Sequence, residues 1–313
     1  MNSPTIAVYT STATDNQPPR FNDSYYAAAY ADLFKQIIAC GGQPIAVYDA
    51  AANYRGNSVF GQSWKAVLSG DDITYSKQTE DIQVDILYDK NRFPFNDIKK
   101  INPSEVNVIC NDKYLSYLFA PDFHPKSFLI ENQSQLDTFA LGYRNKNVAL
   151  KELDSSGGEK VFVGPMSDYH QSLEFPLLAQ EFIDTSGGVK DLVDGLHDVR
   201  VRLFNGQVLG GSLRTPPKNE LRSNTYLGGT ARALFASEIP AELVDKTRVL
   251  DQRFPTTAPR FFSADWGFDK LSSEWKLFEI NNMPGVANQR VDGPAVNEYL
   301  KFLAESLVDS ARL

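Results

Sequence analysis

The segment Trp275-Lys276-Leu277-Phe278-Glu279-Ile280-Asn281-Asn282-Met283-Pro284-Gly285 places two oxygen-bearing side chains two residues apart, between an apolar run and a Pro-Gly turn. Successive side chains of a strand point to opposite faces, so Glu279 and Asn281 share one face. Phe278 and Ile280 share the other face, which can pack into a core. Carboxylate and amide oxygens are hard donors that suit magnesium. A surface hairpin with solvated acids is the alternative interpretation.

The residues just upstream supply a partner strand for this segment. Residues 261–268 form a β-rich run, and the polar residues 269–274 read as the turn that joins the two strands. Around a turn centred in that stretch, an antiparallel register without a bulge sets Asp265 directly across from Glu279. Asp265, Glu279 and Asn281 then converge, and this set of three oxygen donors predicts a metal site.

Charge and composition exclude several classes of function. The 313 residues have a formal net charge of −8 without a basic block or stripe, which argues against binding nucleic acid through its phosphates. Residues 1–9 lack the basic flank and long apolar run of a signal peptide, and no segment approaches membrane-spanning length. We therefore expect a cytoplasmic protein of two or three lobes that acts on small molecules and not at a membrane.

Cysteine and histidine form no catalytic or metal-binding pattern. Cys40 and Cys110 lack metal-binding spacing, so we expect buried thiols without a disulfide framework. The histidines lie far apart in the sequence, and no Ser-His-Asp or Cys-His arrangement can be built from them.

The first 110 residues predict a small α/β lobe with a largely parallel sheet. Its expected elements are a strand at 6–10, a helix at 24–39, a strand at 44–48, a polar glycine-containing stretch at 53–70, and strands at 84–88 and 106–110.

A second unit opens at residue 111 and a third at residue 179. The second has helices at 114–119 and 134–143 and strands at 127–130, 148–151 and 161–163. From residue 178 an antiparallel pattern takes over, with a hairpin pivoting on Asn205-Gly206 and a closing amphipathic helix at 294–310.

The loop that follows the strand at 148–151 contains Ser155-Ser156-Gly157-Gly158. It lacks the Gly-Lys-Ser/Thr ending of a Walker A loop, and no Gly-x-Gly-x-x-Gly fingerprint opens a helix. Adjacent glycines can still fold over phosphates and donate backbone N–H groups. An ordinary flexible turn is the alternative interpretation.

The order of these motifs along residues 111 to about 283 resembles the ATP-grasp superfamily, and in particular glutathione synthetases and ribosomal-protein glutamate ligases. The resemblance implies an α/β fold with an N-terminal parallel-sheet pre-ATP-grasp lobe (1–110), a central ATP-binding lobe (111–178) and a C-terminal lobe with the metal site (179–313), the last two being α+β lobes that sandwich the nucleotide. The motifs that resemble the family are Asp112-Lys113, Lys151, Ser155-Ser156-Gly157-Gly158, Gln180-Glu181-Phe182-Ile183, Asp198-Val199-Arg200, Arg214, Arg222-Ser223-Asn224 with Gly228-Gly229, Asp265, and Glu279-x-Asn281 with Pro284-Gly285.

The resemblance assigns a role to each motif and implies ATP and Mg²⁺ as cofactors, with Mn²⁺ as a substitute. Lysines from two elements are also what a nucleotide's phosphates need when the terminal phosphoryl group moves. The residues expected to bind the nucleotide are Lys113, Lys151, Ser156, Gly157, Gly158, Gln180, Glu181, Phe182, Ile183 and Asp184. The metal ligands expected are Asp265, Glu279 and Asn281.

Arg214, Arg222 and Asn224 are the predicted catalytic residues. If ATP phosphorylates a carboxylate and an amine attacks the acyl phosphate, negative charge builds on a tetrahedral intermediate that guanidinium groups stabilise. An ideal two-residue turn sets Arg214 on the face opposite Asp198 and Arg200, so the three line one pocket only if a bulge intervenes. Arg200 is either an active-site residue or a structural ion-pair partner of Asp198.

These observations predict an ATP-dependent carboxylate–amine ligase that forms an amide or peptide bond between amino acids or peptides. A kinase on the same fold and a non-catalytic nucleotide-binding relative are the alternatives. The expected partners are small-molecule carboxylate and amine substrates, and homo-oligomerisation stays open. For substrate recognition the first lobe offers Tyr25, Tyr26, Tyr30, Arg20 and Arg55, and a helix face or a surface loop is the alternative interpretation of these residues.

Overall fold

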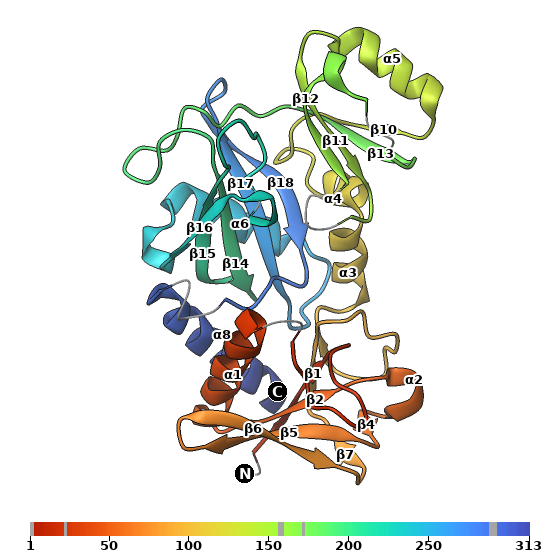
Figure 1. The fold of residues 1–313 in the computed structure, drawn as a ribbon, viewed down its shortest axis with the longest axis vertical. Coiled ribbons are helices and arrows are strands. Elements are labelled where there is room, and N and C mark those ends of the chain that lie inside the picture. The colour runs from red at the N-terminus through yellow and green to blue at the C-terminus, as the bar shows by residue number, and fades with distance from the viewer. Residues whose placement is uncertain (1–2, 22–23, 156–159, 171–172, 224, 288–292) are drawn as a thin grey trace.

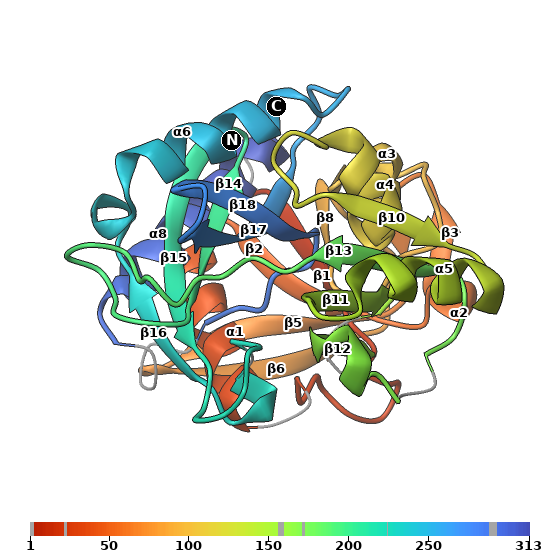
Figure 2. The ribbon, with the colours of Figure 1, turned by 90° about the horizontal axis from the view of Figure 1, so that it is seen from above.

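The computed structural model covers the whole chain and describes every residue except 1–2, 22–23, 156–159, 171–172, 224 and 288–292. Sheets of six, four and five strands form the centres of three lobes (Figure 1; Figure 2). Four residues of the expected site, Ser156, Gly157, Gly158 and Asn224, lie outside the described residues. No helix in the described part of the chain combines the length and apolar character needed to cross a membrane.

The first lobe has a sheet of order β6-β5-β2-β1-β8-β9, with a small sheet β3-β4-β7 beside it. Strands β2, β1, β8 and β9 are parallel, as predicted, and β5 and β6 add an antiparallel hairpin. The elements are β1 (Thr5–Tyr9), α1 (Ser24–Ala39), β2 (Gln43–Val47), α2 (Ala50–Asn53), β3 (Tyr54–Gly56), β4 (Val59–Phe60), β5 (Ser63–Ser69), β6 (Asp72–Gln78), β7 (Ile82–Gln83), β8 (Ile86–Asp89) and β9 (Lys100–Ile101).

The last helix, α8 (Ala295–Arg312), returns to this first lobe and lies beside α1 (Figure 1). Leu303 and Leu307 of α8 are fully buried in the same cluster as Leu33 and Ile37 of α1. The pairs are spaced by one helical turn, which is why both helices present an apolar stripe to the sheet. The C-terminal segment thus helps to hold the first lobe together.

The segment expected as a strand at 106–110 is instead part of helix α3 (Ser104–Asn111), followed directly by α4 (Lys113–Phe119). Val106 and Cys110 are buried, whereas Val108 between them is 56% exposed. Burial at i and i+4 is helical spacing, because alternate residues of a strand would share one face. The strand prediction was therefore wrong, while the helix at α4 is confirmed.

The central lobe is an antiparallel sheet of order β10-β13-β11-β12 covered by one helix. Its elements are β10 (Ser127–Ile130), α5 (Gln133–Tyr143), β11 (Asn147–Glu152), β12 (Val161–Pro165) and β13 (Leu177–Glu181). The strands and the helix expected for this lobe are confirmed, and each begins and ends within two residues of its expected position. Strand β13, which was expected to begin the next sheet, belongs to this one.

The third sheet has the order β16-β15-β14-β17-β18 and is antiparallel throughout. Helix α6 packs Leu243 and Leu250 into a core that also receives Val106 and Cys110 of α3. Its elements are β14 (Asp198–Phe204), β15 (Gln207–Thr215), β16 (Thr230–Leu234), α6 (Ala241–Gln252), β17 (Phe261–Asp269) and β18 (Glu274–Asn281).

Two bulges in this sheet decide which side chains share a face. Between β14 and β15 the register shifts after Arg202, so that Arg214 pairs with Asp198 and all three expected residues of this hairpin lie on one face. Between β17 and β18 the register shifts after Asp265, which then pairs with Glu279. The expected pairing of Asp265 with Glu279 is confirmed. It was derived by assuming a hairpin without a bulge, and that assumption was wrong.

Candidate functional site

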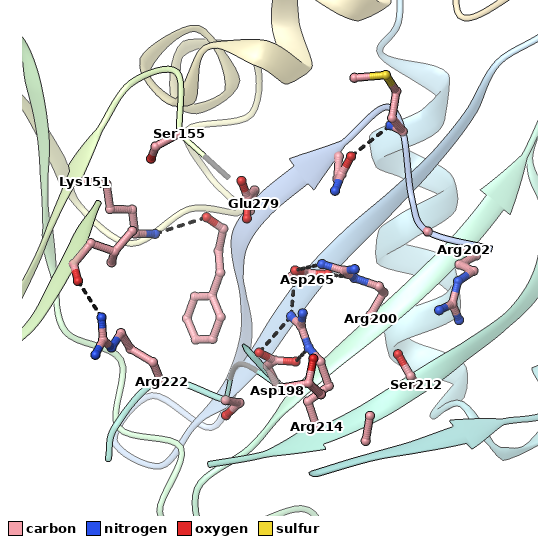
Figure 3. Close-up of a pocket in the computed structure, with 18 of the residues that line it drawn as sticks. Lys151, Ser155, Asp198, Arg200, Arg202, Ser212, Arg214, Arg222, Asp265 and Glu279 are labelled. Atoms are coloured by element: carbon pink, nitrogen blue, oxygen red, sulfur yellow. Dashed lines mark hydrogen bonds and ion pairs between the residues drawn. The ribbon is translucent and has the colours of Figure 1, made fainter. Parts of the chain in front are cut away.

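A cavity of about 1060 Å³ lies where the three lobes meet, and almost all of the described site residues line it. Figure 3 shows its middle part, where Arg200 of β14, Arg214 of β15 and Asp265 of β17 meet. The predicted residues on its wall are Lys113, Lys151, Gln180, Glu181, Phe182, Ile183, Arg214, Arg222, Asp265, Glu279 and Asn281. Asp184 is the described exception, because its carboxylate accepts the Ser186 N–H at 2.9 Å and does not line the cavity.

Lys113 is held at the first turn of α4. The Asp112 carboxylate caps this helix by accepting the N–H groups of Tyr114 and Leu115. The buried Lys113 ammonium donates to the Ser155 hydroxyl at 3.1 Å and lies 3.9 Å from a Glu279 carboxylate oxygen. Burial lowers the pKa of Lys113, and Glu279 partly offsets this effect.

Lys151 enters the cavity from β11, as its position at the end of an apolar run predicted. Its ammonium donates to the Phe278 carbonyl of β18 at 3.3 Å, so it bridges the central and third lobes (Figure 3). Burial lowers the pKa of Lys151 to about 8, although Glu279 favours the charged form. Lys113 and Lys151 are thus two cations from different elements that meet β18 at the adjacent residues Glu279 and Phe278.

The segment Gln180-Glu181-Phe182-Ile183 crosses from β13 into the third lobe along the cavity wall. The Gln180 amide donates to the Ser127 hydroxyl at 2.8 Å, and its buried carbonyl oxygen has no hydrogen-bond partner among the described residues. The Glu181 carboxylate accepts the Tyr143 hydroxyl at 2.9 Å. An extended stretch with apolar and polar side chains is the kind of wall that a purine ring requires.

Asp198, Arg200, Arg214 and Asp265 form a carboxylate–guanidinium cluster at the centre of the cavity (Figure 3). Arg200 donates both Nε and Nη2 to Asp265 at 2.7 Å. Arg214 binds Asp198 at 2.6 and 2.9 Å and reaches Asp265 at 2.7 Å. Arg200 therefore pairs with Asp265 and not with Asp198, the partner considered from the sequence.

The two carboxylates of this cluster differ in electrostatic environment. Burial raises the pKa of Asp198 to about 6, despite its contact with Arg214. Burial acts on Asp265 in the same direction, but Arg200 and Arg214 together hold the pKa of Asp265 well below its ordinary value. Asp265 is consequently a fixed negative charge, whereas Asp198 titrates near the physiological range.

The three expected metal ligands lie on one wall of the cavity. Asp265 and Glu279 are cross-strand neighbours, and Asn281 lies two residues further along β18, with its amide oxygen accepting the Met283 N–H at 2.8 Å. Within the described ranges, no cluster of three His, Cys, Asp or Glu residues could hold a metal alone. Two carboxylates and an amide oxygen nevertheless fit Mg²⁺, which takes few protein ligands and completes its shell with phosphate oxygens and water.

Arg222 links the third lobe to the central lobe. Its guanidinium forms a bidentate pair with Glu220, at 3.0 and 2.8 Å, and donates to the Val161 carbonyl of β12 at 2.8 Å (Figure 3). It therefore lies at the edge of the cavity beside Lys151, away from the central cluster.

The cavity also contains residues that were not expected from the sequence. Thr10 and Lys90 follow the ends of β1 and β8, and Arg202 follows Arg200 by two residues on β14. Polar residues at the ends of two apolar strands are a signal that could have indicated Thr10 and Lys90. Tyr25, Tyr26 and Tyr30 line the cavity as the sequence suggested, whereas Arg20 and Arg55 do not.

Comparison with known proteins identifies the fold. Residues 116–247 match the family described as RimK-like ATP-grasp domain. The structure also matches that of the ATP-grasp ligase PsnB complexed with minimal precursor, Mg and ADP, with a TM-score of 0.58, 13% identity and coverage of 98% of each chain. The fold is therefore that of the ATP-grasp ligases, and the resemblance found in the sequence is confirmed.

Two curated relatives match part of the sequence. A glutathione synthetase of Agrobacterium fabrum is 26% identical over 186 residues, which are 56% of this chain and 52% of that protein. A probable alpha-L-glutamate ligase of Psychromonas ingrahamii is 29% identical over 113 residues, which are 35% of this chain and 31% of that protein. The chain thus spans about half the length of the first relative and about a third of the second.

Proposed function

We propose that this chain is an ATP-dependent carboxylate–amine ligase that forms an amide or peptide bond and releases ADP and phosphate. The single observation that carries the proposal is that Lys113 and Lys151 meet β18 at adjacent residues, Lys113 at Glu279 and Lys151 at the Phe278 carbonyl, with Asp265 directly across the hairpin from Glu279. Cations that neutralise phosphates and carboxylates that hold Mg²⁺ are the two requirements of phosphoryl transfer.

The nucleotide would lie between the central and third lobes. Gln180 to Ile183 would contact adenine, and Lys113 and Lys151 would contact the phosphates together with residues 156–158 of the glycine loop. Asp265, Glu279 and Asn281 would hold the metal, which when bound neutralises phosphate charge. Division into lobes at 1–110, 111–178 and 179–313 is part of this proposal. Asp184, proposed for ribose from the sequence, would have to exchange its contact with Ser186.

The reaction would proceed in two transfers without an enzyme nucleophile. A substrate carboxylate oxygen attacks the γ-phosphorus, the bond to the β–γ bridging oxygen breaks, and ADP leaves. The amine nitrogen of the second substrate then attacks the acyl carbon, loses a proton, and expels inorganic phosphate. Arg200 and Arg214 lie at the cavity centre, where their guanidinium groups would stabilise the oxyanion of the tetrahedral intermediate.

Amino acids or peptides are the proposed substrates, because the two curated relatives are named glutathione synthetase and alpha-L-glutamate ligase. The test is a screen of amino acids and short peptides in pairs for ADP release, with mass spectrometry of any product. A ligase releases ADP only when both an acid and an amine are present. ADP release without an amine, with a phosphorylated product, would instead identify a kinase, and binding of Mg·ATP without turnover would identify a non-catalytic relative.

A further inference from the structure

Asn281, one of the three proposed metal ligands, is the last residue of β18. This strand lies at the edge of the third sheet, and its pairing with β17 ends where Asn281 lies opposite Ser263. Beyond this point the chain turns, and the Asn281 amide oxygen accepts the Met283 N–H at 2.8 Å. The direction of this oxygen therefore depends on how the backbone of Asn282 and Met283 is held.

The next residue, Asn282, is turned towards helix α3 instead of the cavity. It is 5% exposed, and its side-chain amide donates a hydrogen bond to the amide oxygen of Asn107 on α3. Helix α3 runs beside β18 from the first lobe towards the central lobe (Figure 1). Two neighbouring asparagines thus serve two surroundings, because Asn281 lines the cavity and Asn282 packs on the helix.

A further buried asparagine connects the same backbone to the first lobe. Asn102 follows β9 and is 4% exposed. Its side-chain amide donates to the Asn282 carbonyl at 2.5 Å and to the Phe261 carbonyl at 2.6 Å, and its amide oxygen accepts the Phe261 N–H at 2.8 Å. Both N–H groups and the oxygen of this side chain are therefore used.

The hydrogen bonds of Asn102, Asn107 and Asn282 close into a ring, which we call the asparagine network. The Asn282 side chain donates to Asn107, the Asn107 side chain donates to the Asn102 carbonyl at 3.0 Å, and the Asn102 side chain donates back to the Asn282 carbonyl. A buried polar network with its partners in place is rigid. The asparagine network therefore fixes the backbone directly after the proposed ligand.

The first lobe holds the same turn at a second point. Lys90, which follows β8, donates its ammonium to the Pro284 carbonyl at 2.8 Å. The turn is thus attached to the first lobe at Asn282 and at Pro284, on either side of the Met283 N–H that orients the Asn281 oxygen.

We propose that Asn102, Asn107 and Asn282 are positioning residues for the metal site and act through Asn281. The proposal rests on the proposed function, in which Asn281 holds the metal. The three asparagines, all in the described part of the chain, lie outside the cavity wall, so they act on the backbone of the ligand and not on the nucleotide. Removing a residue that orients a metal ligand costs about 10–100-fold in metal affinity.

Titration calorimetry of the full chain, with Mg·ADP and with metal-free ADP in EDTA, tests this role without turnover. The ratio of the two dissociation constants measures the part of the affinity that the metal supplies. Asn107→Ala removes the partner of Asn282 at a half-buried helix position, where alanine favours the helix. We expect Asn107→Ala and Asn282→Ala each to weaken Mg·ADP binding about tenfold and to leave binding of metal-free ADP within twofold.

Double variants show whether the effect passes through Asn281. In the Asn281→Ala background, which already lacks the ligand, adding Asn107→Ala should cause less than a twofold further loss of Mg·ADP affinity. Asn107→Ala and Asn282→Ala together should cost no more than the larger single effect, because the two residues share one hydrogen bond.

Asn53→Ala is the matched control. Asn53 is 3% exposed and donates its side-chain amide to the Tyr48 carbonyl at 3.1 Å within the first lobe. This variant also loses a buried asparagine, but it should leave both dissociation constants within twofold of those of the unaltered chain.

The positioning role is overturned if Asn107→Ala and Asn282→Ala bind Mg·ADP as the unaltered chain does, or if they weaken Mg·ADP and metal-free ADP equally. A further tenfold loss in the Asn281→Ala background overturns it as well. So does equal binding of both nucleotide forms by the unaltered chain, because Asn281 then holds no metal. The ligase function fails separately: the variants behave as expected, yet no pair of acid and amine releases ADP.

Discussion

Glu279 lies directly opposite Asp265 on the paired strands β18 and β17, although the hairpin that joins them contains a bulge. Cross-strand neighbours in an antiparallel pair project from the same face, so both carboxylates reach the cavity. Arg200 and Arg214 hold Asp265 in place, whereas the Glu279 side chain is 37% exposed and, among the described residues, forms an ion pair with Lys113 alone, at 3.9 Å. Of these two proposed metal ligands, Asp265 is therefore held in position, whereas the Glu279 side chain can move.

Glu279→Ala should abolish turnover while leaving the fold intact. Removing a charged group that orients the metal and the phosphates costs about 10²–10³-fold in kcat. ADP release in the presence of the identified substrates measures the effect. Glu274→Ala on the same strand is the control, because the exposed Glu274 carboxylate pairs with Lys276 outside the cavity and its removal should leave turnover unchanged. Unchanged turnover in Glu279→Ala would refute the metal assignment.

Lys151→Met should stabilise the protein and weaken nucleotide binding. The pKa of Lys151 is about 8 in the folded protein and 10.5 ordinarily, so the unfolded chain binds more protons between these pH values. The buried charge therefore opposes folding fully below pH 8, and this penalty disappears as the pH rises towards 10.5. We expect Lys151→Met to raise the free energy of unfolding by about 1–3 kcal/mol at pH 7.

Urea denaturation at pH 7 and pH 10 measures this difference, and calorimetry measures the affinity for Mg·ATP. The stabilisation should shrink at pH 10, while Mg·ATP binding should be weakened at least tenfold at pH 7. A destabilised variant at pH 7 would show that Lys151 supports the fold instead of serving a ligand.

Asp198→Asn should lower kcat by about 10–100-fold with little change in the affinity for Mg·ADP, because it loosens Arg214 without touching the nucleotide contacts. The pKa of Asp198 is raised to about 6, so the unaltered enzyme should lose activity below pH 6 as this carboxylate is protonated. The variant should lack that acid limb in a plot of log kcat against pH. An identical limb in both proteins would assign it to another group.

Most of the fold could be predicted because its elements have strong local signals. Helix α1 is bounded as expected, and the central lobe follows its alternating strands and helix closely. The segment that forms helix α3 was predicted to be a strand because of its β-branched residues. Two features indicate a helix instead: Pro103 directly before it, and the helical spacing of the buried residues Val106 and Cys110. The β5–β6 hairpin was missed because no residue of β6 is fully buried and its apolar alternation is limited to Ile73 and Tyr75.

The candidate site could be predicted where several of its side chains belong to one sequence motif. It was harder to predict where side chains from elements distant in the sequence come together. Glu279 and Asn281 share a strand, so their common face follows from the period of two. Arg214 could be placed only conditionally, because Gly210 and Gly211 permit a bulge in this strand but do not fix whether or where it occurs. Lys90 and Arg202 line the same cavity because the first lobe packs on the third, and no local pattern in the sequence encodes that packing.

Because of the bulge between β14 and β15, the face of the sheet on which Arg214 lies depends on whether the number of residues between Asp198 and Arg214 is odd or even. Adding or removing one residue between Asp198 and Arg214 would turn Arg214 into the hydrophobic interior, whereas a change of two would return it to the cavity. A loop grafted into this hairpin therefore keeps Arg214 in the cavity only if it changes the length of the hairpin by an even number of residues.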